Sequence, residues 1–186
     1  MVTLYHAPRS RSSRFIWLLE ELGAPYEIVQ VDIKRRTGVG ARDPRNPHPD
    51  GKVPALVHGG QLVTESAAIA LYLTDLFPEK RIGPLPGDAR RSEYLTWLAY
   101  YAGVMEPVLF DREKNGEEAE KVDRRVLQAL DPGPYLLGDR FSAADILVAS
   151  LLQFARNLLP QAVALDEFVA RVTARPALAR AQAKDG

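Results

Sequence analysis

Residues 51–73, GKVPALVHGGQLVTESAAIALYL, hold residue types suited to binding a small peptide that carries a carboxylate. The Val53-Pro54 step precedes a short apolar run, and proline has no amide hydrogen for a sheet ladder. This step therefore belongs at a strand start or a sheet edge. With a cis bond, the amide and carbonyl of Val53 would face outward and could pair with an extended peptide. The residues alone also permit a trans proline that opens a strand.

The other two parts of this segment are a hairpin and a helix start. Gly59-Gly60 lies between short apolar runs and suits the positive-φ positions of a type I′ turn. Thr64-Glu65-Ser66 precedes the apolar run Ala67–Leu73, so a hydroxyl of Thr64 or Ser66 can cap a helix. Because a helix N-terminus has unpaired amide groups, it can bind a carboxylate. The alternative is a helix cap without a ligand.

The elements that must position these residues follow from the pattern of residues 1–80. Ser12–Leu22 has apolar residues at helical spacing and is followed by Gly23, which is typical of a helix end. The order is βαβ, a long loop over 34–51, then ββα, and a parallel βαβ unit requires such a crossover helix. We therefore expect an α/β thioredoxin-like domain. Its expected strands are 2–6, 26–31, 55–57 and 62–63, and its expected helices are 12–22 and 66–76.

The rest of the chain is helical in pattern. Arg81–Asp88 contains two prolines and two glycines and is predicted to be a linker. We expect domains over 1–80 and 89–186, the second all-α. Ser142-Ala-Ala-Asp145 has the form of a capping box, which we assign to folding rather than to chemistry. The expected helices are 89–113, 117–130, 142–159, 167–173 and 176–183.

Composition excludes several classes of function. The chain of 186 residues has no cysteine, so disulfides, thiolate metal sites and a thiol nucleophile of the protein itself are excluded. Its three histidines lack the spacing of a metal site, and none is expected. The 24 basic residues equal the 24 acidic ones, which argues against nucleic acid as a partner. No run is apolar enough to span a membrane and no signal peptide is visible, so we expect a cytoplasmic protein.

Four motifs in this order resemble the cytosolic glutathione S-transferases: LYHAPRSRSSRFIWLLEELG, GKVPAL, ESAAIALYL and FSAADILVAS. The resemblance covers nearly the whole chain. It implies glutathione as co-substrate, no permanently bound cofactor, a homodimer, and a role in detoxification. It also implies a cis Val53-Pro54 bond, with the valine backbone pairing with the cysteinyl unit. Glu65 and Ser66 would hold the γ-glutamyl end, and Lys52, with His48 or Arg36, would pair with the glycyl carboxylate.

Such a site must ionise a thiol. A free cysteinyl thiol has a pKa of about 8.5, so only about 3% is thiolate at neutral pH. Lowering this pKa from about 8.5 to about 6.5 requires that the site stabilise the thiolate by about 2.7 kcal/mol. One or two charge-assisted hydrogen bonds can supply this free energy. The candidate donors lie where the first strand meets the first helix. They are Tyr5, Ser10, Arg11, Ser12 and Ser13.

The resemblance points to two possible donors. Tyr5, followed by Arg11, is similar to the tyrosine-type transferases, whereas Pro8-Arg-Ser10 is similar to the serine-type classes. We favour Ser10, with Arg11 as an electrostatic helper, and leave the class open. Tyr5 can instead be a core residue, and Ser12 and Ser13 can be helix caps. The beta-class cysteine is absent, and Glu106-Pro107 replaces the beta-class His-Lys pair.

The function predicted from the resemblance is conjugation of glutathione to a small hydrophobic electrophile. Two alternatives remain: a glutathione-dependent peroxidase or disulfide reductase, which without cysteine would need two glutathione molecules, and a non-catalytic glutathione-binding module. In the family the electrophile pocket lies against the long helix of the second domain. Its candidate wall residues here are Tyr100, Tyr101, Val104, Met105 and Val108, although a stripe at helical spacing can equally be core.

Overall fold

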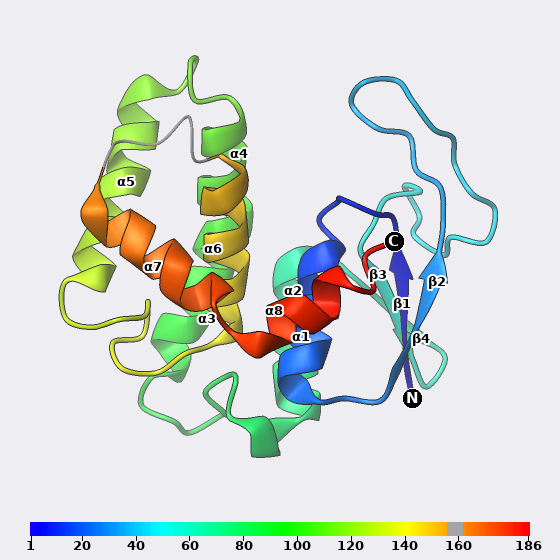
Figure 1. Ribbon diagram of the computed structural model, residues 1–186, viewed down its shortest axis with the longest axis horizontal. Helices are drawn as coiled ribbons and strands as arrows, with labels where there is room; N and C mark the ends of the chain where they lie inside the picture. Colours follow the sequence, from blue (N-terminus) through cyan, green and yellow to red (C-terminus); the bar gives the residue numbers. More distant parts are fainter. Residues whose placement is uncertain (156–161) are drawn as a thin grey trace. The chain divides into compact units, whose positions relative to one another are not determined.

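The structure is a computed structural model that describes residues 1–155 and 162–186 (Figure 1). Its described residues form two compact units. One comprises Met1–Leu73 together with Pro176–Gly186, and the other comprises Thr74–Arg175. The sequence analysis placed the division near residue 80 and kept the last helix with the second domain. The structure instead groups that helix with the first unit, because it packs along the first helix of the chain.

The first unit is a four-stranded mixed sheet in the order β2-β1-β3-β4. β1 pairs in parallel with β2 and antiparallel with β3, which in turn forms a hairpin with β4. Both glycines of the hairpin turn, Gly59 and Gly60, have positive φ, as a type I′ turn requires. The elements of this unit are β1 (Val2–His6), α1 (Ser13–Leu22), β2 (Tyr26–Gln30), β3 (Ala55–His58), β4 (Gln61–Thr64), α2 (Ser66–Leu76) and α8 (Pro176–Gln182).

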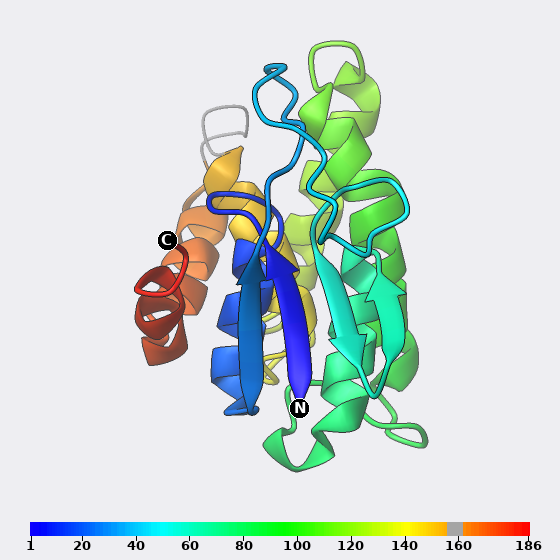
Figure 2. The same cartoon turned by 90° about the vertical axis from the view of Figure 1, so that its right-hand side faces the viewer.

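One face of the sheet is covered by α1 and α2, which lie behind it in Figure 2. The side chains of α1 that face the core are fully buried, among them Phe15, Ile16 and Leu19. Along β1, Val2, Leu4 and His6 are buried whereas Thr3 and Tyr5 are half-buried. This alternation places Tyr5 and His6 on opposite faces of the sheet. The predicted crossover helix over 12–22 is thus observed as α1, and its apolar residues face the core.

A cluster of polar side chains links α8 to α1. The carboxylate of Glu20 accepts hydrogen bonds from Tyr26 at 2.6 Å, from Arg180 at 2.8 Å and from Lys184 at 2.5 Å. Burial raises the pKa of Glu20, but these three donors outweigh it and lower the pKa to about 2. Glu20 therefore helps to hold the C-terminal segment, which carries Arg180 and Lys184, against α1 within the first unit.

We expect Glu20→Gln to lower the free energy of unfolding by about 1 kcal/mol at neutral pH, since two of the three donors are half exposed. The pKa of Glu20 is lower in the folded state than its ordinary value of 4.5. Its contribution is therefore complete above that value and is lost as the pH falls toward 2. Urea unfolding at neutral pH and near pH 3 measures this. The gap between the wild-type and variant stabilities should narrow near pH 3, and an equal gap at both pH values would contradict the assignment.

The second unit is helical. Its long first segment is one continuous helical stretch in which α3 (Arg91–Tyr100) passes through a π-helical turn (Tyr101–Met105) into α4 (Glu106–Phe110). α6 is buried on nearly all sides, as predicted for a central helix. Its buried residues include Ile146 and Leu147. Residues 156–159, the end of that predicted helix, lie outside the described residues. The remaining elements are a 3-10 turn (Pro78–Lys80), α5 (Gly116–Leu130), α6 (Ala143–Phe154) and α7 (Val163–Thr173).

The predicted capping box at the start of α6 is confirmed. Ser142 donates to the Asp145 carboxylate from its backbone amide at 2.7 Å and from its hydroxyl at 3.0 Å. The other carboxylate oxygen accepts the Leu136 amide at 2.8 Å. Asp145 therefore both caps α6 and holds the preceding loop, which makes it a folding residue.

Candidate functional site

The turn between β1 and α1 gathers three serine side chains. The hydroxyls of Ser10 and Ser12 are 2.7 Å apart, and the Ser12 amide donates to Ser10 Oγ at 3.1 Å. The Ser10 amide faces Ser13 Oγ at 3.3 Å. Ser10 is half-buried, whereas Ser12 is 0% exposed. Ser10 is therefore placed to meet a ligand, and Ser12 lies directly behind it.

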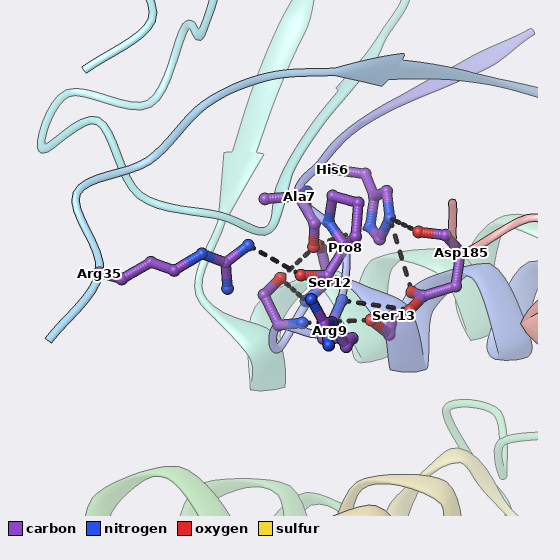
Figure 3. A network of polar contacts seen from close by, with 9 residues as sticks. His6, Ala7, Pro8, Arg9, Ser12, Ser13, Arg35 and Asp185 are labelled. Carbon is purple, nitrogen blue, oxygen red and sulfur yellow. Dashed lines mark hydrogen bonds and ion pairs between the residues drawn. The ribbon is translucent and has the colours of Figure 1, made fainter. Parts of the chain in front are cut away.

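The side chain of Ser12 does not cap α1. It bonds inward instead, to the His6 imidazole and to the Ala7 amide (Figure 3). Sequence reasoning offered Ser12 either as a donor to the ligand or as a helix cap. Because its hydroxyl is buried among protein groups, it can reach a ligand only through Ser10.

Three arginines and one carboxylate lie in or near the Ser10 turn. Arg9 has a positive φ of 53°, and its amide donates to Asp185 Oδ2 at 3.1 Å. Arg11 is exposed beside Ser10 at the start of α1. Arg35 extends from the loop after β2 and donates to the Pro8 carbonyl at 2.9 Å (Figure 3). Together with the helix N-terminus, these guanidinium groups favour an anion at this turn.

Tyr5 belongs to a neighbouring apolar cluster and not to the hydrogen bonds that join this serine group. It is half-buried and packs against a small apolar cluster formed by Ala7, Val31 and Val53. It also lies on the face of β1 opposite to His6, the imidazole that contacts Ser12. The geometry therefore places Ser10, and not Tyr5, in the hydrogen-bonded group.

The Val53-Pro54 step lies next to the same turn. The peptide bond is cis, and Val53 packs with Ala7 in the apolar cluster. Asn46 Nδ2 donates to the Lys52 carbonyl at 2.9 Å and so holds the approach to the step. The segment that could pair with an extended peptide therefore lies close to the segment that carries Ser10.

A strained residue marks the start of α2. Glu65 is exposed and has a positive φ of 69°. This backbone conformation costs free energy for any residue other than glycine, and such strained residues are enriched at ligand sites. Ser66 follows as the first residue of α2 and is buried at 9% exposure. The first amides of α2, like those of any helix N-terminus, have no partner within the helix and can bind a carboxylate.

Lys52 and His48 lie in the loop before β3. Lys52 is exposed, and its Nζ is 3.4 Å from the exposed Asp50 carboxylate, a pair that contributes little stability and can be exchanged for a ligand. His48 is buried, its Nδ1 accepts the Asp50 amide at 3.1 Å, and burial lowers its pKa. The structure thus gives His48 a role in holding the loop and leaves Lys52 accessible.

The predicted pocket residues of the second unit fall into two groups. Tyr101 and Met105 are fully buried, and the Tyr101 hydroxyl donates to Glu106 at 2.6 Å. Tyr100, Val104 and Val108 keep exposed surface, and Arg125 stacks over the Tyr100 ring at 3.8 Å. The first group belongs to the core of the unit. Only the second group could line an accessible wall.

Sequence reasoning missed two residues of the turn. His6 was considered only as a metal ligand, and Asp185 was not considered. Their contact joins positions that are 179 residues apart in the sequence, and no local sequence pattern predicts such a contact. The described residues contain no cluster of His, Asp or Glu that could hold a metal ion. Within the same part of the chain, no helix has the length and apolar character needed to cross a membrane.

Comparison with known proteins agrees with this geometry. Residues 1–75 match the family model "Glutathione S-transferase, N-terminal domain", and residues 110–180 match "Glutathione S-transferase, C-terminal domain". Glutathione S-transferase GstA of Escherichia coli O157:H7 is 27% identical over 98% of both chains. Glutathione S-transferase 3 of Zea mays is 30% identical over 94% of this chain and 90% of its own.

A solved structure shares the architecture. A sphingomonad glutathione S-transferase in complex with glutathione superposes with a TM-score of 0.83 at 27% identity, covering 99% of this chain and 98% of its own. A thioredoxin-like mixed sheet followed by a helical domain is the glutathione S-transferase fold. The chain therefore belongs to the glutathione S-transferase family.

Proposed function

We propose that the protein is a glutathione transferase that ionises the thiol of glutathione and conjugates it to a small hydrophobic electrophile. The observation that carries this proposal is the position of Ser10. The residue is partly accessible and lies in the turn before α1, next to Arg11 in sequence, and its hydroxyl is held by Ser12. A hydroxyl held in this way can donate to a thiolate without reorganising, which is how fixed donors lower a barrier.

The other contacts follow the shape of glutathione. Val53 supplies a backbone edge for the cysteinyl unit. Ser66, with the amides at the start of α2, is suited to the γ-glutamyl carboxylate, and Lys52 to the glycyl carboxylate. Tyr100, Val104 and Val108, which keep accessible surface, are the candidate contacts for the electrophile. We also expect a homodimer, as in the family.

The proposal is tested by a pH titration of the ultraviolet thiolate band of glutathione bound to the protein. We expect a midpoint about two pH units below that of the free thiol, because one or two charge-assisted hydrogen bonds stabilise the thiolate by that amount. Conjugation of a chlorodinitrobenzene should follow the same midpoint. Binding with an unshifted midpoint would contradict the proposal and indicate a glutathione-binding module without catalysis.

The same preparation distinguishes the reductase alternative. With no cysteine in the chain, reduction of a peroxide or disulfide must consume two glutathione molecules and yield glutathione disulfide. A transferase consumes one glutathione for each electrophile and yields a thioether. Product analysis with both substrate types assigns the reaction.

A further inference from the structure

A chain of hydrogen bonds leads inward from Ser10. Ser10 Oγ is 2.7 Å from Ser12 Oγ, which is 2.8 Å from Nδ1 of His6. On the other side of the ring, Nε2 of His6 lies 3.1 Å from the Asp185 carbonyl and 3.5 Å from its Oδ1 (Figure 3). The ring and the Ser12 hydroxyl are both buried. The four side chains therefore connect an accessible hydroxyl to a buried imidazole and a carboxylate.

The Asp185 end of this chain determines which nitrogen of His6 carries a hydrogen. The backbone carbonyl of Asp185 can only accept, so Nε2 must be the donor. The second ring nitrogen, Nδ1, is then free to accept a proton from Ser12. Asp185 Oδ1 is buried and has no hydrogen bond within the described part of the chain. A buried carboxylate oxygen without a donor is stabilised by a nearby positive charge, which an imidazolium would supply.

Along this chain the serine hydroxyls can point in either of two directions with the same heavy-atom positions, while the Ala7 carbonyl, 3.4 Å from Ser12 Oγ, is a longer and competing acceptor for the Ser12 hydroxyl. With neutral His6, Ser10 donates to Ser12 and Ser12 donates to Nδ1. With protonated His6, Nδ1 donates to Ser12, Ser12 donates to Ser10, and the Ser10 hydrogen is free to face a ligand. The Ala7 amide at 3.2 Å from Ser12 Oγ and the Ser12 amide at 3.1 Å from Ser10 Oγ are donors in both states. The two states differ by one proton.

We infer that His6 receives the thiol proton of bound glutathione through Ser12 and Ser10, and that Asp185 stabilises the resulting imidazolium; this rests on the proposed function. The S–H bond breaks as the sulfur proton passes to Ser10 Oγ. The Ser10 proton then passes to Ser12 Oγ, and the Ser12 proton passes to Nδ1. The products are a thiolate that accepts from Ser10 and a cationic His6, with no change of oxidation state. After conjugation the proton returns by the same path to the leaving group or to water.

Other charged groups near the turn are engaged elsewhere or exposed. Lys184, the neighbour of Asp185, donates to Glu20 and to the Tyr26 hydroxyl. The Arg35 guanidinium donates to the Pro8 carbonyl, and Arg9 and Arg11 are exposed. Asp185 is the carboxylate that directly faces the His6 ring. It also accepts the Arg9 amide, so the same side chain holds the backbone next to Ser10.

The test compares wild type with His6→Asn and Asp185→Asn. An asparagine amide can still hydrogen-bond to Ser12 but cannot take up a proton, and Asp185→Asn removes the charge while keeping the backbone acceptor. Two quantities are measured with glutathione: the midpoint of the thiolate band, and the protons released into a weak buffer containing an indicator dye. Binding of S-methylglutathione, which has no thiol, reports on the shape of the site. Its proton release is subtracted.

In wild type we expect the thiolate to form with almost no proton released, since His6 retains it. With His6→Asn the midpoint should rise by about one pH unit or more, and each thiolate formed should release about one proton. S-methylglutathione should bind unchanged. Asp185→Asn should raise the midpoint in the same direction, by less. His58→Asn, which changes a histidine of β3 that bonds to the Tyr72 hydroxyl, is the matched control and should match wild type.

Two outcomes overturn the inference without touching the proposed function. One is a wild-type thiolate that forms with a full proton released. The other is an unchanged midpoint in His6→Asn or, should that variant not fold, in Asp185→Asn. A wild-type midpoint equal to that of free glutathione would instead contradict the proposed function, so the two failures are distinguishable.

Discussion

Replacing Ser10 by alanine is expected to lower kcat/KM for conjugation by roughly 10- to 100-fold. One hydrogen bond to a charged group contributes about 1.5–3 kcal/mol, and the variant loses this donor to the thiolate. The midpoint of the bound thiol should rise by about one to two pH units for the same reason. Steady-state kinetics with a chlorodinitrobenzene and the thiolate titration measure both effects.

Tyr5→Phe is the matched control, because it also removes one hydroxyl. Tyr5 lies on the face of β1 opposite to His6 and packs against the apolar cluster of Ala7, Val31 and Val53. We expect its kcat/KM to stay within about threefold of wild type, because the proposal assigns the donor to the thiolate to Ser10 and not to the Tyr5 hydroxyl. A tenfold loss in Tyr5→Phe with little loss in Ser10→Ala would reverse the assignment. Losses below tenfold in both variants would remove both residues from the mechanism.

The largest expected effect on stability belongs to Asp145→Ala. Its carboxylate accepts the amides of Leu136 and Ser142 and the Ser142 hydroxyl, all in a buried setting. Burial raises the pKa of Asp145 to about 6 while these donors lower it, so the side chain is ionised at neutral pH. Its loss leaves two buried amides unpaired, at about 1–3 kcal/mol each, and removes the cap of α6. We expect unfolding to become easier by about 3 kcal/mol or more.

Urea unfolding followed by circular dichroism measures this change. Asp145→Asn retains one carbonyl oxygen of the same shape and can accept one of the two amides, so its loss should be about half as large. Ser150→Ala, on the same helix, serves as a control. Its hydroxyl donates to the Leu147 carbonyl within α6, and its loss should cost well under 1 kcal/mol. Equal stabilities of Asp145→Ala and wild type would show that the loop and helix do not depend on this carboxylate.

Features whose partners lie within a few residues of each other could be predicted from the sequence. The apolar spacing of 12–22, the Gly59-Gly60 turn and the Ser142–Asp145 cap each depend on geometry repeated over three or four positions. The structure has all three. Ser10, in the turn before α1, and Ser66, at the first position of α2, lie next to helix starts that were predicted for the same reason.

Features that depend on packing between distant segments could not be predicted in this way. The sequence offered both Tyr5 and Ser10 as possible donors and only slightly favoured Ser10. They differ because the pleat of β1 turns Tyr5 to the face opposite His6, where it packs against the apolar cluster. Tyr101 and Met105 belonged to one aromatic and apolar stripe with Val104, and only tertiary packing shows which of them are buried.

By itself the sequence determined the family, the thioredoxin-like and helical halves, and the absence of any thiol nucleophile supplied by the protein itself. Only the tertiary structure decided that α8 packs on α1, which brings Asp185 to the Nε2 edge of His6 and places Ser12 between that ring and Ser10. The physical reason is that local hydrogen bonding and periodicity leave a signal in neighbouring residues. A contact across 179 positions exists only when the folded core brings its two ends together.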